Sequence, residues 1–137
     1  LIALGISSIG KVGPTYSQNV KTLDEYYDTI DSHKLPIMRG LELTADDLLR
    51  RAIIQALMCH FEISYESLEI AYLIDFKNYF KEEINQLREY EKEGLLTLGE
   101  QSMTVLPKGR LLIRTICMTF DKYLRQEQER QRYSKVI

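Results

Sequence analysis

The longest nearly unbroken apolar run in the chain is Gly109-Arg110-Leu111-Leu112-Ile113-Arg114-Thr115-Ile116-Cys117-Met118-Thr119-Phe120-Asp121-Lys122-Tyr123-Leu124. Its apolar residues recur at spacings of three and four, which is the period of one side of an α-helix. Leu111, Cys117 and Met118 widen that side, so the pattern predicts a single buried helix at the centre of its domain. The charged groups of Arg110, Arg114 and Asp121 need partners or solvent, because burying an unpaired charge is costly.

Three further helices are predicted before this run, over residues 44–60, 64–71 and 75–93. Thr44 (with Asp47 three residues later), Ser64 and Asp75 are suited to begin them as N-cap residues, and Gly94 is suited to end the third. Residues 95–98 and 102–106 alternate around a Gly-Glu-Gln turn, which indicates a β-hairpin. The side chains expected to face the core are Leu49, Ile53, Leu57 and Phe61 (or the neighbouring Ile54 and Met58), Phe76, Phe80, Ile84 and Leu87.

Residues 43–137 are therefore predicted to form a mainly α domain with a small hairpin, in the element order of a winged-helix domain. DNA binding is disfavoured by the charge of the third helix. Residues 75–93 carry four basic and six acidic side chains, whereas a helix that reads a DNA groove needs the opposite sign to release counterions from phosphate. We expect the domain to serve in packing or interaction instead.

The first 42 residues have a different character. Residues 1–6, Leu-Ile-Ala-Leu-Gly-Ile, predict a short buried strand, which needs a sheet that the nearby sequence does not supply. Residues 11–20 are predicted as a loop, residues 22–30 as a helix begun by a capping box of Thr22 and Glu25, and residues 31–40 as irregular. The chain begins without Met, directly in an apolar run, so we expect a fragment whose strand partners lie upstream.

The composition excludes several classes of function. A net charge of −2 does not favour nucleic acid or an anionic membrane surface. The apolar runs are shorter than the roughly 18 residues needed to span a bilayer, and no signal peptide opens the chain, so a cytoplasmic protein is expected. Cys59 and Cys117 belong to no Cys/His cluster and are expected to be reduced thiols inside helical patterns. Neither a metal site nor a catalytic residue is predicted within the chain.

Several segments together resemble one family, oxygen-independent coproporphyrinogen III oxidase, over its C-terminal third. They are residues 1–9 (Leu-Ile-Ala-Leu-Gly-Ile-Ser-Ser-Ile), Tyr16-Ser17-Gln18-Asn19, Arg39-Gly40, residues 46–51 (Asp-Asp-Leu-Leu-Arg-Arg), residues 76–80 (Phe-Lys-Asn-Tyr-Phe), residues 109–118 with Phe120-Asp121, and the terminal Ser134-Lys135-Val136-Ile137. One departure is Leu106, where the family usually has Thr, and this leaves the start of the final helix less well defined.

The resemblance implies a radical S-adenosylmethionine (SAM) enzyme of haem biosynthesis. In that family a [4Fe–4S] cluster cleaves SAM to a 5′-deoxyadenosyl radical, and two propionates of coproporphyrinogen III lose hydrogen, CO2 and an electron to become the vinyls of protoporphyrinogen IX. The cluster needs three cysteines in a C-x-x-x-C-x-x-C loop, which this sequence lacks. The chain is therefore expected to bind neither SAM nor the cluster by itself, and to be inactive alone.

The same resemblance implies three parts and a set of partners. Residues 1–20 would be the last strand and rim loop of the catalytic radical SAM barrel, residues 21–42 a linker helix and loop, and residues 43–137 a C-terminal helical domain that acts as lid and scaffold. The expected partners are the upstream barrel and the porphyrinogen substrate, with no nucleic acid and no membrane. The full-length enzyme is expected to be a monomer.

Candidate site residues also follow from the resemblance. Ile9 falls where an apolar residue of the family lines the SAM site, although it would serve equally as an ordinary core residue. Substrate contacts are considered for Tyr16, Gln18 and Asn19 on the barrel rim, and for Arg39, Arg110 and Arg114, since a porphyrinogen with four propionates calls for cations. Loop fixation for the first three, and ion pairs at a domain interface for the arginines, are the favoured alternatives.

Two other functions remain open at this point. The related radical SAM haem chaperone usually has Gly-x-Gly-Ala-His-Ser after its final strand, where this chain has Gly5-Ile6-Ser7-Ser8-Ile9-Gly10. An independent winged-helix interaction module is the third possibility. The polar residues 126–132 are followed by Tyr133-Ser134-Lys135-Val136-Ile137, and we expect this apolar end to dock on the barrel or to fold back onto the helical domain.

Overall fold

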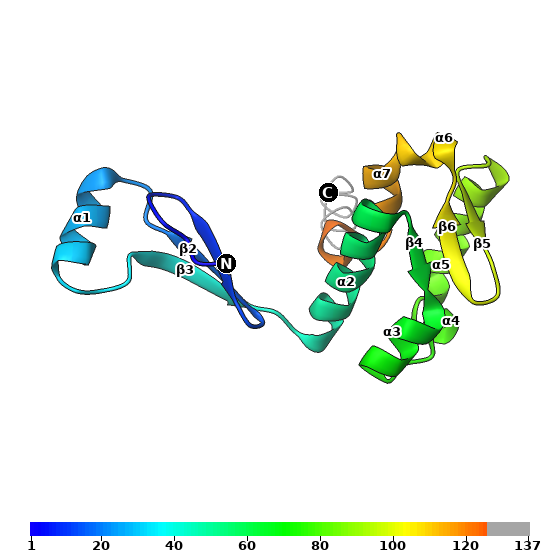
Figure 1. Cartoon of the computed structure of the whole chain (residues 1–137), viewed down its shortest axis with the longest axis horizontal. Helices are drawn as coiled ribbons and strands as arrows, with labels where there is room; N and C mark the ends of the chain where they lie inside the picture. The colour runs from blue at the N-terminus through cyan, green and yellow to red at the C-terminus, as the bar shows by residue number, and fades with distance from the viewer. Residues whose placement is uncertain (126–137) are drawn as a thin grey trace, which may run out of the picture. The chain divides into compact units, whose positions relative to one another are not determined.

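The computed structural model describes residues 1–125 and divides the chain into two compact units, each described separately (Figure 1). Unit 1 is Leu1–Leu48, and unit 2 is Leu49–Ile137, described as far as residue 125. The predicted docking of Tyr133 to Ile137 lies outside the described residues. The predicted three-part division of the chain at residues 20 and 42 stays a prediction.

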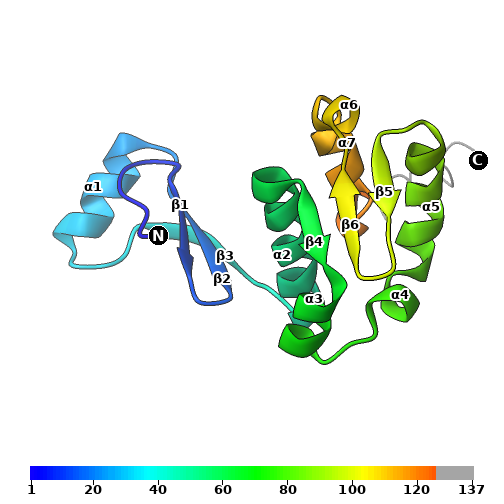
Figure 2. The ribbon, with the colours of Figure 1, turned by 45° about the vertical axis from the view of Figure 1, so that its right-hand side comes forward.

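Unit 1 is built on a three-stranded antiparallel sheet in the order β1-β2-β3. Its elements are β1 (Ile9–Val12), β2 (Thr15–Asn19), α1 (Leu23–Asp31) and β3 (Ile37–Glu42). Gly13 connects β1 to β2 at a φ of 56°, a conformation that glycine adopts without steric cost. Helix α1 lies beyond the end of the strands in both views, so it covers neither face of the sheet (Figures 1 and 2).

Three predictions for unit 1 are wrong. Residues 1–6 form no strand, because Gly5 at φ 89° and Ser7 at φ 57° turn the backbone away from an extended path. Residues 11–20 are mostly strand rather than loop, and residues 37–42 form β3 rather than an irregular segment. Each of these strands is specified by its pairing with another, and pairing is not visible in the local sequence.

The predicted helix after Thr22 is confirmed, with a different cap. Thr22 is the N-cap residue of α1, but its side chain accepts no hydrogen bond from the helix backbone. Its Oγ1 instead donates to Glu25 Oε2 at 2.8 Å. The two residues of the expected capping box therefore bind each other, and only half of that prediction holds.

Unit 2 holds most of the helices and a second antiparallel sheet, in the order β4-β6-β5. The elements are α2 (Ala45–His60, which begins in unit 1), β4 (Glu62–Ser64), α3 (Tyr65–Tyr72), α4 (Phe76–Tyr79), α5 (Lys81–Lys92), β5 (Leu96–Leu98), β6 (Ser102–Val105), α6 (Pro107–Arg110) and α7 (Ile113–Met118). Residues 122–125 are also helical. Figure 2 shows the three strands side by side, with α5 next to β5.

The N-cap residues in the sequence predicted most of these helix starts correctly. The capping box at α2 is confirmed: Thr44 N donates to Asp47 Oδ2 at 2.9 Å, and Asp47 N donates to Thr44 Oγ1 at 3.2 Å. Ser64 and Asp75 cap α3 and α4 through their side-chain oxygens. The predicted third helix is broken at Phe80 (φ −103°, ψ 30°) into α4 and α5. The predicted hairpin is present, and β4 joins it as an unpredicted third strand; the winged-helix likeness itself stays a prediction.

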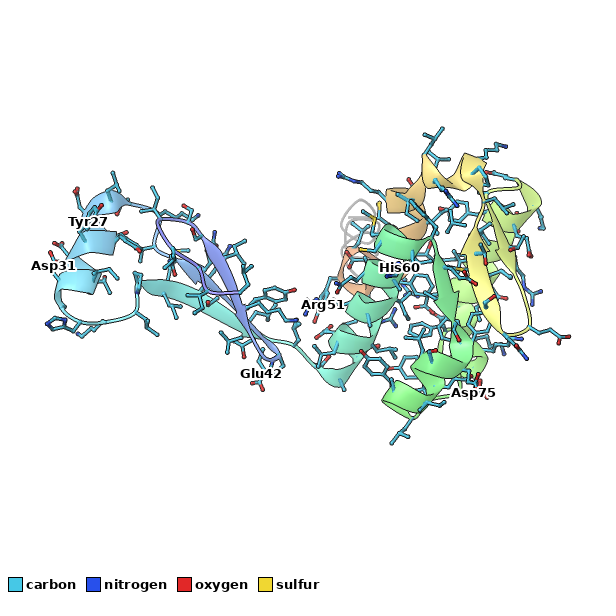
Figure 3. The ribbon with its side chains drawn as sticks, in the orientation of Figure 1. Tyr27, Asp31, Glu42, Arg51, His60 and Asp75 are labelled. Atoms are coloured by element: carbon cyan, nitrogen blue, oxygen red, sulfur yellow. The ribbon has the colours of Figure 1, made fainter. Side chains whose placement is uncertain are left out.

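The core of unit 2 lies between α2, α5, α7 and the sheet, where side chains crowd together in Figure 3. The predicted inward residues Leu49, Ile53, Leu57, Phe76, Phe80 and Leu87 are all buried, and Phe61, Ile54 and Ile84 pack against the core. Phe80 meets Phe76 at 5.0 Å and Phe120 at 5.5 Å between ring centroids. Aromatic contacts therefore join α4 to the residues that follow α7.

The single buried helix predicted over residues 109–124 is wrong. It is interrupted at Leu111 and Leu112, so that α6 and α7 are separate, and Leu111 is 90% exposed. The break lies at Leu112, whose φ of −109° and ψ of 18° are not helical. Within α6, Gly109 lies close to the preceding hairpin, because a Cβ atom at this position would lie 2.0 Å from the carbonyl oxygen of Leu95. Of the apolar residues in this run, Ile116, Cys117 and Phe120 are buried in the core. Asp121 then accepts hydrogen bonds from the backbone N–H groups of Tyr123 and Leu124, both at 3.0 Å.

A buried carboxylate joins three separate segments of unit 2. Glu83 of α5 is 3% exposed and accepts hydrogen bonds from Arg50 of α2, at 2.8 Å, and from Arg125. Arg50 also donates to the backbone oxygen of Phe120 at 3.2 Å and lies 5.1 Å above the Phe80 ring. We call Glu83, Arg50 and Arg125 the Glu83 clasp. It ties α2, α5 and residues 122–125 together with charge-assisted hydrogen bonds.

The clasp fixes the protonation state of Glu83. Burial alone raises the pKa of this carboxyl, but the hydrogen bonds from Arg50 and Arg125 outweigh burial and hold the pKa below its ordinary value of 4.5. The unfolded chain therefore takes up this proton at a higher pH than the folded chain. The resulting contribution to the free energy of unfolding is present above pH 4.5 and is lost as the pH falls through the lowered pKa.

Glu83→Gln is expected to lower the free energy of unfolding by about 3 kcal/mol near neutral pH, because two guanidinium groups lose their charged acceptor. The difference in the free energy of unfolding between the parent and Glu83→Gln should become smaller in acid, because protonation of Glu83 removes its negative charge in the parent as well. Urea denaturation followed by circular dichroism, near pH 7 and near pH 3, measures both effects. Glu82→Gln is the control, since Glu82 is 82% exposed and its pair with Arg125 should contribute under about 1 kcal/mol. Equal losses of unfolding free energy in Glu83→Gln and Glu82→Gln would contradict the stabilising role of the Glu83 clasp.

Gly109→Ala is expected to lower the free energy of unfolding by about 1–3 kcal/mol, because the new Cβ overlaps the Leu95 backbone and the chain must shift. Gly40→Ala is the matched control, since its Cβ would meet only the Tyr16 oxygen at 3.4 Å. The same denaturation experiment reports the difference. A Gly109→Ala variant as stable as the parent would show that α6 can move away from Leu95 without cost.

Candidate functional site

The register of the unit 1 sheet brings three of the predicted site residues into one row. Ile9 of β1 pairs with Gln18 of β2, and Gln18 pairs with Arg39 of β3. The next row on the same face joins Lys11, Tyr16 and Leu41, because side chains two residues apart on a strand share a face. Residues that lie far apart in the sequence thus form one surface.

Five of the six residues in these two rows, all except Lys11, line a hollow of about 470 Å3. Its lining residues are Ile9, Tyr16, Ser17, Gln18, Arg39, Gly40 and Leu41. Ile9 is 58% exposed and Leu41 is 57% exposed, so the hollow presents apolar side chains to its surroundings. A surface of this kind is typical of a ligand site with a few polar groups among apolar ones.

Arg39 supplies the positive charge of this hollow. Its Nε donates to Gln18 Oε1 at 2.9 Å, which holds the guanidinium over the sheet. Within residues 1–125 no carboxylate forms an ion pair with Arg39. The terminal guanidinium nitrogens can therefore bind a ligand carboxylate, for which a planar guanidinium is well suited.

Asn19 does not line this hollow. It is 3% exposed, and its Nδ2 donates to the carbonyl oxygens of Gly5 at 2.9 Å and Ala3 at 3.4 Å. The register shift after Gln18 accompanies this change of direction. Asn19 therefore holds residues 3–5 beside the sheet, and the structure gives it a part in positioning this segment.

Arg110 and Arg114 belong to unit 2, so they do not join the hollow in unit 1. The Arg110 guanidinium lies 4.6 Å above the ring of Phe61, a residue held at a φ of 60°. Arg114 is exposed on α7. No ion pair of either arginine occurs within the described residues, so the interface pairing expected for them stays a prediction.

The chain's own residues do not fit an iron–sulfur cluster. Cys59 is exposed on α2, whereas Cys117 is buried on α7 and burial raises its pKa to about 11, so that it stays a thiol. Cluster ligation needs several thiolates close together. Within residues 1–125 no three His, Cys, Asp or Glu side chains form a group that could hold a metal ion. The helices in this part of the chain are too short or too polar to cross a membrane.

Several residues of functional interest were not identified from the sequence. Ser17, Gly40 and Leu41 enter the hollow only through the strand register, which the sequence did not reveal. Glu83 did carry a signal: it stands three residues after Phe80 and four before Leu87, on the inward side of α5. A carboxylate at such a position indicates a buried partner, and here two arginines supply it.

The comparisons with known proteins agree on one family. A family model described as "HemN C-terminal domain" matches residues 43–112. Over all 137 residues the chain is 43% identical to "Oxygen-independent coproporphyrinogen III oxidase" of Pseudomonas aeruginosa and 42% identical to the protein of that name from Escherichia coli K12. It spans about 30% of the length of these curated relatives.

A solved structure gives the same result. It is described as "Coproporphyrinogen III oxidase (HemN) from Escherichia coli is a Radical SAM enzyme" and matches with a TM-score of 0.84 and 41% identity. The match covers 88% of this chain and 28% of that one. At this identity the likeness extends beyond a shared fold.

Asn19→Asp is expected to release residues 3–5 from the sheet, because a carboxylate would face the carbonyl oxygens of Ala3 and Gly5 in place of a donor. The backbone amide resonances of these residues should move toward unfolded values in two-dimensional NMR spectra. Gln18→Glu makes the same chemical change on the neighbouring residue, where Arg39 can pair with the new charge. It should leave residues 3–5 in place, because the Gln18 amide donates to the Ser7 oxygen and not to Ala3 or Gly5. Unchanged resonances in Asn19→Asp would contradict the positioning role.

Proposed function

The chain belongs to the HemN C-terminal domain family, and we propose that it is the C-terminal part of a longer oxygen-independent coproporphyrinogen III oxidase. In that enzyme two propionates of coproporphyrinogen III are decarboxylated oxidatively to vinyls by radical SAM chemistry. Unit 1 forms one wall of the site that holds SAM and substrate, and unit 2 belongs to the scaffold of the same enzyme. The likeness to named oxidases along the whole chain carries the proposal.

The hollow in unit 1 is suited to this part. The exposed side chain of Ile9 offers an apolar contact for SAM, which supplies the radical chemistry when the cluster cleaves it. Arg39, held by Gln18, offers the cation that a substrate propionate needs. Tyr16 and Gln18 lie in the same two rows and complete the wall. These residues bind and orient; the chain contributes no group that transfers hydrogen or electrons.

The cluster belongs to the rest of the longer enzyme in this proposal, because Cys59 and Cys117 cannot assemble its ligand set. SAM likewise needs further walls, since the hollow is open on the side away from the sheet. The 137-residue chain alone is therefore inert. The relatives that match over the whole chain are named as the oxidase, which makes the haem chaperone and the independent interaction module weaker candidates.

Unit 1 also presents more apolar surface than a free domain of its size can leave uncovered. Its exposed large apolar side chains are Leu1, Ile2, Leu4, Ile6, Ile9, Val12, Leu23, Tyr27, Ile30, Leu35, Ile37, Met38 and Leu41. Exposed apolar side chains in this number are expected where a domain packs against another part of a protein. The remaining part of the longer enzyme, more than twice the length of this chain in the relatives, is the proposed cover.

The test is made in the longer enzyme, with its cluster reconstituted. Ile9→Asp is expected to weaken SAM binding by about tenfold or more, because it places a charge where an apolar contact is made. Arg39→Gln is expected to leave SAM binding unchanged and to raise the KM for coproporphyrinogen III. Equilibrium dialysis with labelled SAM and an assay of protoporphyrinogen IX formation separate the two effects.

Ile30→Asp provides the matched control, since Ile30 lies on α1 outside the hollow. It should not alter SAM affinity. Failure of the parent enzyme to convert coproporphyrinogen III would overturn the proposed activity. Equal SAM affinity in Ile9→Asp and the parent would not affect the proposed activity, but it would show that the hollow is not part of the SAM site.

A further inference from the structure

A second hollow, of about 310 Å3, lies in unit 2 and is separate from the one in unit 1. It opens between α4, α5 and the turn of the β5–β6 hairpin, which come close together in both views (Figures 1 and 2). The residues that line it are Tyr65, Lys77, Lys81, Ile84, Asn85, Arg88, Glu91, Leu98 and Gly99. We call it the α5–hairpin hollow.

Positive charge is concentrated in this hollow, although the helical segment that lines it is negatively charged overall. Residues 75–93 carry six acidic and four basic side chains, so this segment is negative as a whole. Three of the four basic residues, Lys77, Lys81 and Arg88, line the hollow, whereas Glu91 is the one acidic residue of the six that does. Such a separation of charge is expected of a surface that attracts an anion.

The one carboxylate is already engaged. Glu91 Oε1 accepts a hydrogen bond from the backbone N–H of Leu98 at 2.7 Å, which holds the hairpin against α5. Within residues 1–125, neither Lys81 nor Arg88 has an ion-pair partner. In the neighbouring hollow of about 550 Å3, by contrast, Arg50 and Arg125 are bound to Glu83. The α5–hairpin hollow therefore keeps its cations available for a ligand.

The rest of the lining is rigid and partly apolar. Tyr65 is 4% exposed, and its ring stacks on Phe76 with centroids 4.5 Å apart, while Lys77 lies 5.7 Å from the centre of the same ring. Burial and the nearby Glu91 raise the pKa of the Tyr65 phenol, so it stays neutral and adds no negative charge. Ile84 and Leu98 supply aliphatic walls. A volume near the lower end of ligand pockets suits a small molecule.

We propose that the α5–hairpin hollow binds an oxyanion, a carboxylate or a phosphate, carried on a small apolar body. Arg88 and Lys81 contact the oxyanion from the α5 side, and Tyr65, Ile84 and Leu98 pack against the apolar body. The site lies wholly in unit 2 and does not depend on the function proposed for unit 1.

The test uses the 137-residue chain and two-dimensional NMR titrations at constant ionic strength. Phenyl phosphate and 3-phenylpropionate are the two probes, and they distinguish a phosphate ligand from a carboxylate ligand. Inorganic phosphate tests whether the apolar body is needed. At least one organic probe is expected to cause saturable shifts at the amides of Asn85, Arg88, Leu98 and Gly99, and to bind more tightly than inorganic phosphate.

Arg88→Gln and Lys81→Gln are each expected to weaken this binding by about tenfold, since each removes a charge-assisted hydrogen bond. Lys92→Gln is the matched control on the same helix, because Lys92 pairs with Glu89 outside the hollow. It should change the affinity less than about twofold. Unaltered resonances of Phe80 and Ile116 will show that the variants are folded. The proposal is overturned if no probe gives saturable shifts, or if Arg88→Gln binds as tightly as Lys92→Gln.

Discussion

The uneven burial of apolar side chains between the two units is the constraint on which this account depends. Every member of the hydrophobic core, from Leu49 to Phe120, lies in unit 2. Unit 1 forms a sheet of three short strands whose faces α1 does not cover, and many of its large apolar side chains are exposed. A three-stranded sheet is stable only when an apolar face is packed against something. In the proposed longer enzyme, the remaining part of the chain would supply that cover.

Unit 2 holds itself together by interactions of its own. The Glu83 clasp joins α2, α5 and residues 122–125 through ion pairs. The missing side chain of Gly109 lets α6 approach the Leu95 backbone. Both features connect segments that are far apart in the sequence. Because the core and the clasp are complete within unit 2, this unit needs no cover for its stability and can offer the α5–hairpin hollow to a ligand. The two units thus have different physical roles.

The sequence predicted what is decided locally. The caps at Thr44, Ser64 and Asp75 depend on residues within one helical turn, and the hairpin after Gly94 depends on a short turn. The predictions of a strand at residues 1–6 and a loop at 11–20 failed because strand pairing is tertiary. The prediction of an unbroken helix at 109–124 failed because the backbone leaves the helical conformation at Leu112, which the apolar period does not reveal. Among the site residues, family resemblance indicated Ile9, Gln18 and Arg39, but only the strand register places them in one row. The resemblance also suggested Asn19, by its place on the barrel rim, and Arg110, by its charge, but neither lines the hollow.

Amide hydrogen exchange of unit 1, compared between the isolated monomeric chain and the longer enzyme, tests the central claim most directly. The account predicts that the amides of β1, β2 and β3 exchange at least about tenfold more slowly in the longer enzyme, because their sheet is then covered. The amides of α2 and α5 in unit 2 should be protected to a similar degree in both proteins. Equal protection of β1, β2 and β3 in the isolated chain would show that unit 1 is stable without a cover, and would contradict the account.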